Sequence, residues 1–395
     1  MKKLKLSLGL IAFMGVTNCA MAQTIIDQGN CGAQGNNLTW VLTSDSVLVI
    51  YGKGDMEDYD QTLYRPWDSY RNSIATLLIG DSVTTVGLRA FVSCSNLVSV
   101  IIGNNVTTIK LFAFADCTSL TSVSIPNNVI DIEGQIFLKC SNLTSIDVDN
   151  DNTYYSSENG VLFNKSKTIL IKYPEGKTNE NYIIPNSVIT IGDYAFYQCY
   201  RLTSVTIPNS VTIIGGYAFE NCTGLVSVII PNNVMTLEYC VFANCNGLVS
   251  VTVQWTEPLI APYGLFRDVI TKNVKLYVPQ GTAKAYRSAD VWKDFQIDEY
   301  EVGIANTTQM VSNIKIYPNP TTGQLTISPA GGGKGVEELT IEKIEIYNVM
   351  GQLLYQINKS TNKQINKEFS IDVSHLSAGM YFLKIENKVV KFVKE

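Results

Sequence analysis

The sequence is poor in the residues from which most enzymes build a catalytic centre. It contains a single histidine, His375, in 395 residues, and charged residues make up only 16% of the chain. A Ser–His–Asp or Cys–His centre needs a histidine beside the nucleophile, in a cleft of the main body, whereas His375 lies near the C-terminus. No two acids share a predicted element in a way that suits two-carboxylate hydrolysis. We therefore predict that the protein is not an enzyme and binds no cofactor.

Long apolar runs are also missing, except at the N-terminus. Residues 1–22 combine a basic start, the apolar run Leu8–Val16 and the small-residue end Ala20–Ala22, which together predict a secretory signal peptide. Leu8–Val16 is too short to span a bilayer, and no later stretch reaches the roughly 18 apolar residues of a membrane helix. We expect no transmembrane segment in the mature chain. Cys19 leaves a lipoprotein alternative open, although Val-Thr-Asn is a poor approach to a lipidated cysteine.

Positive charge is scarce in the main body of the chain. The formal net charge is −5, and it becomes −8 without the three lysines of the signal peptide. Residues 313–395 hold 10 lysines against 8 acids, so residues 23–312 carry a net charge of −10. Such an acidic body repels a phosphate backbone, and the sequence contains no basic stripe that would offset this repulsion. We expect no nucleic-acid partner.

The dominant feature is a period of 23 residues, which is the spacing of a repeat protein. Phenylalanine, cysteine and leucine recur at this spacing in two blocks of three coils. The phenylalanines are Phe91, Phe114, Phe137, Phe196, Phe219 and Phe242, and the cysteines are Cys94, Cys117, Cys140, Cys199, Cys222 and Cys245. Six matching units indicate a stacked array rather than a globular core.

One unit, Leu202 to Gly224, shows how each repeat is built. Val205–Ile207 alternates apolar and polar residues and is rich in β-branched side chains, which predicts a half-buried strand. Pro208–Asn209 then turns the chain. Tyr217–Cys222 is expected to form a short helical or 3₁₀ turn that carries Ala218, Phe219 and Cys222 inward. The unit is one coil of a solenoid, and a single coil cannot bury enough apolar surface to fold alone.

The repeats should therefore be capped at both ends. We expect an N-terminal cap over residues 23–73, repeats over 74–253 with a longer coil at about 143–180, and a C-terminal cap over 254–300. The cap regions are rich in tryptophan but stand outside the 23-residue register: Trp40, Trp67, Trp255 and Trp292, with Phe266 among them.

These residues closely resemble the BspA-like subfamily of leucine-rich repeats. The resemblance rests on Leu-Thr-Ser-Val-x-Ile-Pro-Asn-Ser-Val-x-x-Ile-Gly-x-x-Ala-Phe-x-x-Cys at 202–222. Cys31–Gly32 followed by Asn37–Trp40 looks like the entry segment that the family also has. The resemblance covers about residues 31–300. It implies a right-handed solenoid with a parallel sheet on its inner face, and an association with adhesion.

The sequence changes character after a polar linker at 301–312. Residues 313–395 contain short alternating strands without the period, which predicts a small β-sandwich. The motifs resemble the C-terminal sorting domain of the type IX secretion system; their residues are Tyr317, Pro318, Asn319, Pro320, Gly379, Tyr381, Lys391 and Lys394. The resemblance implies the type IX machinery as a partner and export through the periplasm to the cell surface or the medium. Surface attachment and free release both stay open.

Eight cysteines remain after signal removal, a number that first suggests disulfides. Six of them share one repeat position. Stacked strands lie about 4.8 Å apart with parallel side chains, a geometry that does not suit a disulfide. We therefore expect a stack of reduced, buried thiols. Cys31 and Cys240 stand outside this register, and their redox state stays open. Metal binding is disfavoured because no histidine accompanies the cysteines.

An acidic segment offers the one candidate metal site. Asp147, Asp149 and Asp151 followed by Glu158 match a calcium loop, except that Asn152 stands where glycine is expected. Asparagine can adopt the left-handed backbone that this place requires. Against the match, no helix pattern flanks the loop and Asp147 belongs to a repeat strand. We expect no metal, with calcium as a weak alternative.

The residues that alternate with the core positions of each strand form the candidate binding face. They are mostly hydroxyl-bearing and nearly uncharged: Ser99, Ile101, Ser122, Ser124, Ser145, Asp147, Ser204, Thr206, Ser227, Ile229, Ser250 and Thr252. The leading hypothesis is an exported, adhesin-like module that binds an unidentified protein or glycan through this face. The alternative is a structural surface component that associates with its own kind. Fold by itself does not decide between them.

Overall fold

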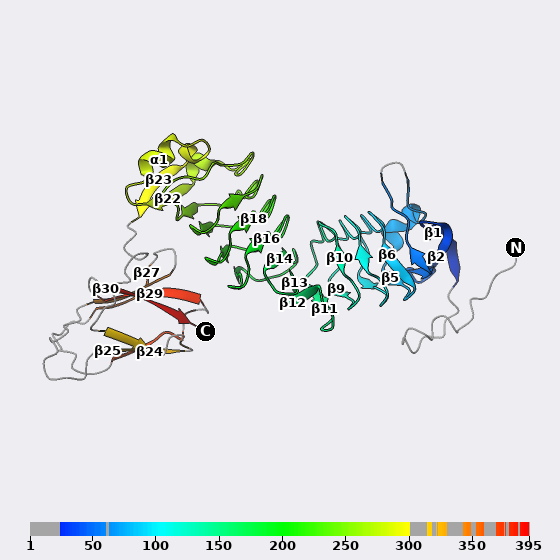
Figure 1. Cartoon of the computed structure of the whole chain (residues 1–395), viewed down its shortest axis with the longest axis horizontal. Coiled ribbons are helices and arrows are strands. Elements are labelled where there is room, and N and C mark those ends of the chain that lie inside the picture. The colour runs from blue at the N-terminus through cyan, green and yellow to red at the C-terminus, as the bar shows by residue number, and fades with distance from the viewer. Residues whose placement is uncertain are drawn as a thin grey trace. The chain divides into compact units, whose positions relative to one another are not determined.

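The structure, a computed structural model, describes residues 24–60 and 63–300 and, between 314 and 394, the strands of the C-terminal domain with a few connections (Figure 1). The expected signal peptide and linker lie outside the described residues. The described chain is a parallel β-solenoid followed by antiparallel sheets, which confirms the predicted fold class. It divides into an N-terminal unit, Met1–Lys165 with Pro174–Lys177, and a C-terminal unit, Ser166–Tyr173 with Thr178–Glu395.

In the N-terminal unit, an antiparallel entry leads into parallel coils. One sheet has the order β1-β2-β3-β5-β7, antiparallel up to β3 and parallel after it: Ile25–Gly32, Gly35–Thr43, Val47–Gly52, Thr76–Ile79 and Ser99–Ile101. The other faces of the coils form a second parallel sheet of β4, β6, β8 and β10: Gly54–Asp55, Val83–Val86, Thr108–Ile109 and Asp131–Ile132. β9 and β11, Ser122–Ile125 and Ser145–Val148, pair in parallel. An antiparallel hairpin of β12 and β13, Tyr155–Glu158 and Val161–Asn164, completes the unit.

The C-terminal unit repeats this two-sheet coil. The main sheet contains β15, β17, β19, β21, β22 and β23: Asn181–Ile183, Ser204–Thr206, Ser227–Ile230, Ser250–Val253, Lys275–Pro279 and Gln296–Tyr300. The second sheet contains β14, β16, β18 and β20: Ile169–Lys172, Thr190–Ile191, Ile213–Ile214 and Thr236–Leu237. A short helix α1, Ala283–Ser288, connects β22 to β23. All pairs in these two sets are parallel, because each strand meets its counterpart one coil later.

A column of stacked aromatic rings runs through the core of each unit. In the N-terminal unit the rings of Trp67, Phe91, Phe114 and Phe137 lie 5.4, 5.5 and 5.8 Å apart and nearly parallel. In the C-terminal unit the column contains Tyr173, Phe196, Phe219, Phe242 and Phe266. Offset stacking and full burial of such rings are a large part of core stabilisation. The column is longer than the motif suggests, because tryptophan or tyrosine can take a phenylalanine place.

Phe266 shows how the solenoid tolerates a break in register. It lies 24 rather than 23 residues after Phe242, yet the two rings stack at 5.4 Å with an interplanar angle of 13°. Trp292 and Phe295 then meet Phe266 edge to face at 5.9 and 5.0 Å and end the column. The extra residue lies in the loop before Phe266, where no strand has to stay in register with the neighbouring coil.

The segment expected to be a short helical or 3₁₀ turn consists of consecutive hydrogen-bonded turns. Two residues in each coil adopt positive φ, four positions apart, for example Tyr217 at 56° and Asn221 at 60°. A left-handed residue interrupts an α-helix, so the segment cannot become helical. Inter-coil bonds hold this backbone in place: the N–H groups of Tyr217, Phe219 and Asn221 donate to Tyr239, Val241 and Ala243 at 2.9–3.0 Å.

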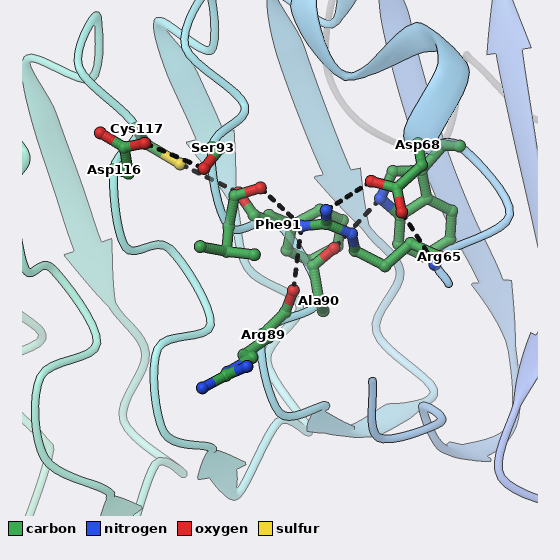
Figure 2. Close-up of polar contacts among 10 residues, drawn as sticks. Arg65, Asp68, Arg89, Ala90, Phe91, Ser93, Asp116 and Cys117 are labelled. Atoms are coloured by element: carbon green, nitrogen blue, oxygen red, sulfur yellow. Dashed lines mark hydrogen bonds and ion pairs between the residues drawn. The ribbon is translucent and has the colours of Figure 1, made fainter. Parts of the chain in front are cut away.

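Side chains of the N-terminal cap donate hydrogen bonds to the carbonyl groups in the turn of the first coil (Figure 2). Within the array, the carbonyl groups at this level accept backbone N–H groups from the preceding coil. In the first coil, Ala90 O accepts the indole Nε1–H of Trp67 at 3.1 Å, and Val92 O accepts Arg65 Nη1–H at 2.5 Å. Asp68 forms an ion pair with Arg65 and holds the guanidinium in place. The cap therefore supplies donors that a missing coil would have provided.

The cysteines of the repeat are all buried and form no disulfide, as expected for reduced thiols. Each thiol of four coils lies 3.0–3.2 Å from the carbonyl oxygen of the phenylalanine of the preceding coil; the donors are Cys117, Cys140, Cys222 and Cys245. Cys31 and Cys240 are likewise buried and free.

The C-terminal domain has two antiparallel sheets around one apolar cluster. The smaller sheet contains β24, β25 and β28: Ile314–Tyr317, Gln324–Pro329 and Phe369–Asp372. The larger sheet contains β26, β27, β29 and β30: Lys343–Asn348, Leu353–Asn358, Gly379–Ile385 and Lys388–Lys394. Leu325 and Ile371 from the first sheet share a buried cluster with Ile346 and Leu383 from the second. This is the arrangement of a small β-sandwich.

Candidate functional site

On the N-terminal unit, the predicted face residues project from the strands to solvent. Ser99, Ile101, Ser122 and Ser124 are all exposed, and the side chain of Ile101 keeps 44% of its surface accessible. Ser122 and Ser124 lie opposite Ser145 and Asp147 in the parallel pairing of β9 with β11. Ser145 Oγ donates to the Asp147 carboxylate at 3.0 Å, so this end of the face is polar and acidic.

On the C-terminal unit, the same positions form two columns across the main sheet. The pairing of β15 through β23 places Asn181, Ser204, Ser227, Ser250, Lys275 and Gln296 in one column. The other column contains Ile183, Thr206, Ile229, Thr252, Tyr277 and Asp298. The predicted members of these columns are all partly exposed. They make a flat surface in which hydroxyl groups alternate with apolar side chains.

Sequence reasoning missed both ends of these columns. Asn181 accepts the Ser204 hydroxyl at 2.5 Å at one end. At the other end, Lys275 pairs with Asp298 at 2.9 Å, and Lys275 Nζ lies 5.9 Å from the centre of the Tyr277 ring. The hydrogen bond to Asp298 raises the pKa of Lys275. Only the strand pairing reveals these residues, since β22 and β23 depart from the repeat motif.

The acidic segment is organised around a buried asparagine. Asn152 is fully buried, and its Nδ2 donates to Pro126 O and Val129 O of the preceding coil at 2.8 and 2.9 Å. Its Oδ1 accepts the N–H groups of Tyr154 and Tyr155, both at 2.8 Å. The hydrogen bonds to Pro126 O and Val129 O hold the long coil against the preceding coil.

The carboxylates of the calcium-loop match do not converge. Asp149 accepts the N–H of Asp151 at 2.9 Å in a local turn, and Glu158 projects from β12. Positive φ occurs at Asn159 and Gly160, after Glu158, instead of at the sixth place of the loop. Within the part of the chain that the structure describes, no three Asp, Glu, His or Cys residues are grouped as metal ligands.

The sorting motifs lie on strands and turns of the C-terminal domain. Tyr381 is buried in β29, and Lys391 pairs with Phe382 across β29 and β30. Lys394 is buried, pairs with Gly379, and forms an isolated bridge with Thr321. Tyr317 ends β24, while Pro318, Asn319 and Pro320 lie outside the described residues. Strand β30 therefore pairs with β29 and, through Lys394, with Thr321 near the start of the domain.

Two family matches account for these parts of the chain. The BspA type leucine rich repeat region matches in six copies, over residues 69–179 and 175–260. The secretion system C-terminal sorting domain matches residues 315–395. This chain is a BspA-type leucine-rich repeat protein with a C-terminal sorting domain. Neither matched region of this leucine-rich repeat protein is a catalytic family. The sorting domain directs the protein to the type IX secretion machinery and so to the cell surface or the extracellular space.

Several known proteins are similar to this leucine-rich repeat protein. A leucine-rich repeat protein from Eubacterium ventriosum is 28% identical, with 65% of this chain and 79% of that one covered and a TM-score of 0.46. The pneumococcal vaccine antigen PcpA is 18% identical, with 70% and 99% covered and a TM-score of 0.45. A stretch of 85 residues is 28% identical to ulvan lyase NLR42 from Nonlabens ulvanivorans, which is 21% of this chain and 14% of that enzyme. The chain thus spans about a seventh of the curated relative that it matches.

None of the helices that the structure describes is long and apolar enough to cross a membrane.

Proposed function

We propose that this exported protein is an adhesin-like binding module that engages a protein or a glycan through the strand face of its C-terminal unit. The strand face is defined here by Ser204, Thr206, Ser227, Ile229, Ser250 and Thr252, together with Asn181, Ile183, Lys275, Tyr277, Gln296 and Asp298. The observation that carries the proposal is the pairing that lines these residues up in two columns over six strands.

The chemistry of the strand face suits recognition of a polar partner. Hydroxyl groups recur at the spacing of parallel strands, about 4.8 Å, and the side chains of Ile183, Val226 and Val249 remain 44–58% exposed among or beside them. Tyr277 and the Lys275–Asp298 pair add an aromatic ring and both signs of charge at one end. Interfaces commonly combine a few aromatic and apolar contacts with a polar surround.

The test compares the secreted chain with variants in which the strand face is charged. A glycan array and a pull-down from extracellular-matrix extract first provide a ligand, and its saturable binding is then measured by surface plasmon resonance. Thr206→Glu places a carboxylate in the middle of the second column and should abolish binding. Thr236→Glu, on the second sheet of the same unit, is the matched control and should bind normally. Equal binding by both variants would refute the proposal.

A second candidate is a structural surface component that associates with its own copies. The exposed apolar members of the strand face are the observation that favours it. Light scattering over a range of protein concentrations distinguishes the two. Concentration-dependent assembly that Thr206→Glu prevents, without any saturable heterologous ligand, would support self-association instead of adhesion.

A further inference from the structure

A second surface, on the turns of the C-terminal unit, carries a row of tyrosines. We define the tyrosine row as Tyr194, Tyr217, Tyr239 and Tyr263, which come from four successive coils. Inter-coil hydrogen bonds fix their backbone: Tyr217 N–H donates to Tyr239 O at 3.0 Å, and Cys240 N–H donates to Tyr263 O at 3.1 Å. The ring of Tyr217 lies 4.7 Å from that of Tyr194 and 5.0 Å from that of Tyr239. Exposure rises along the row to 45% for Tyr239 and 81% for Tyr263.

The ring of Tyr239 lies flat over the backbone of Gly216. A Cβ atom at Gly216 would stand 3.1, 3.2 and 3.5 Å from Cζ, Cε2 and Cε1 of that ring. Nearly equal distances to three adjacent ring atoms, with none to the hydroxyl oxygen among them, place this point above the face of the ring and not beyond its edge. Glycine therefore makes room for the ring, which is also nearly perpendicular to Tyr217, at 83°. With one face against Gly216 and 45% of Tyr239 exposed, part of the ring remains accessible to solvent.

Polar groups lie near the ring of Tyr239. The Asp193 carboxylate accepts the N–H of Gly216 at 2.8 Å, directly beside the Tyr239 ring. Arg267, whose charge acts on Tyr217 of the row, pairs through Nη2 with Glu220 Oε1 at 2.9 Å, and 39% of its side chain remains exposed. Burial, followed by the neighbouring Cys240, raises the pKa of Tyr217, so its hydroxyl remains a proton donor. A partly exposed aromatic ring with a few fixed donors and acceptors near it is the composition of a small-ligand site.

The N-terminal unit lacks this arrangement. Tyr239 directly precedes the left-handed residue Cys240, and the corresponding residues of the N-terminal coils are Leu88, Leu111 and Gly134. The Arg89 guanidinium lies over the ring of Phe112, 5.4 Å from its centre, at the position that Tyr217 holds in the C-terminal unit. The partly exposed ring therefore results from the residues of the C-terminal unit and is not a general consequence of the repeat.

We propose that the tyrosine row is a binding site for a neutral polysaccharide, with a pyranose ring stacked on Tyr239. The face of a pyranose presents C–H groups that carry partial positive charge, and the face of an aromatic ring carries the negative part of its quadrupole. Sugar hydroxyl groups would bond to Asp193 and Arg267. A neutral polymer fits because residues 23–312 carry a net charge of −10, which repels an anionic one. The site is separate from the strand face, so each can fail without the other.

The experiment measures how soluble polysaccharides bind to the full secreted chain. Affinity electrophoresis and isothermal titration calorimetry are run with galactomannan, xyloglucan, laminarin and soluble starch, and with alginate as the anionic comparison. We expect saturable binding to at least one neutral polymer and none to alginate. Tyr239→Ala should weaken binding by about tenfold or more, because it removes the stacking face. Tyr239→Phe, which keeps the ring, should bind within about twofold of the parent.

Two further variants separate the site from general effects. Gly216→Ala places a methyl group 3.1 Å from the ring, so it should displace Tyr239 and weaken binding while Tyr239 itself is unchanged. Tyr154→Ala removes a tyrosine that is 52% exposed on the N-terminal unit, and should have no effect. Thermal melting checks that each variant is folded. Absence of binding to every neutral polymer, equal loss in Tyr154→Ala, or undiminished binding by Tyr239→Ala would each overturn the proposal.

Discussion

The thiol of Cys222 donates to the carbonyl oxygen of Phe196, 26 residues earlier, at 3.0 Å. The same bond joins Cys245 to Phe219 at 3.0 Å, and equivalent bonds recur in the N-terminal unit. Phe196 O also accepts the backbone N–H of Cys199 at 3.1 Å, so the thiol is a second donor to this carbonyl group. The repeated cysteine is therefore a small apolar side chain that also supplies a hydrogen-bond donor to the neighbouring coil.

Replacing this thiol should separate its two roles. We expect Cys222→Ala to lower the free energy of unfolding by about 1–3 kcal/mol, because it leaves a small cavity and removes one of the two donors to Phe196 O. Cys222→Ser retains a donor and should cost less than Cys222→Ala. Urea unfolding followed by circular dichroism measures both. A larger loss for serine than for alanine would show that the hydrogen bond contributes less than the apolar contact.

The buried thiols should make the protein sensitive to alkali. Burial raises the pKa of Cys94 and Cys245 from the ordinary value of 9.0 to about 12, and burial also raises the pKa of Tyr300 to about 12. Below pH 9 these thiols keep their protons in both states. Between pH 9 and 12 only the unfolded chain releases them, so the free energy of unfolding should fall as pH rises.

Urea unfolding at several pH values above neutrality measures this slope. In Cys245→Ser the slope should be smaller, because the serine hydroxyl does not titrate in this range. An unchanged free energy of unfolding up to pH 11 or so would contradict the linkage.

The cap donors should protect the first coil. Trp67→Phe keeps a ring to stack on Phe91 but leaves Ala90 O without its indole donor, and we expect a loss of about 1–3 kcal/mol. Hydrogen exchange is the sharper measurement, because local opening should be confined to the neighbouring coil. The amide of Phe91 should exchange faster, while that of Phe219, in the other unit, should not change. Equal acceleration at both amides would argue against a local cap.

Asn152 provides a test of the calcium loop. Asn152→Gly restores the glycine of the calcium-loop pattern but removes four hydrogen bonds. We expect a less stable protein that still gives no heat on calorimetric titration with calcium. Asn152→Asp should be worse, by about 3 kcal/mol or more, since it buries a charge against two carbonyl groups. Calcium-dependent stabilisation of either variant, reversed by a chelator, would contradict this reading.

Removal of the sorting domain should stop delivery. A chain that ends at Ser312 is expected to accumulate inside the cell envelope, because it lacks the domain that the type IX machinery handles. Cell fractionation and surface protease shaving measure its location, with the full chain as the control. Surface display of the truncated chain would show that export uses another signal.

Much of this architecture can be predicted from the local sequence. The 23-residue period identifies which residues of each coil are buried, because side chains that recur at one place in every coil stack on one another. Phe219 and Cys222 are accordingly buried, and Thr206 is accordingly on the surface. Alternation in Val205–Ile207 needs no tertiary information, since successive side chains of a strand point to opposite faces. The sorting motifs are local in the same way.

Other features depend on which coil lies beside which. Tyr173 and Phe266 join the aromatic column although one lacks the motif residue and the other lacks the register. Asn152 matches a calcium ligand place in the sequence, but the carbonyl groups that it binds come from the preceding coil. The strand face extends to Lys275 and Asp298 only because β22 and β23 add to the same sheet.

The sequence by itself therefore determined the coil, its buried positions and the export domain, because these follow from periodicity and from motifs of adjacent residues. Only the tertiary structure decided which surface residues lie side by side. Gly216 and Tyr239 lie 23 residues apart, and neither belongs to a motif that suggests binding. Stacking of their coils places the glycine beneath the ring and leaves part of Tyr239 exposed. Contacts across coils depend on the shape and pairing of both neighbours, which a single repeat does not specify.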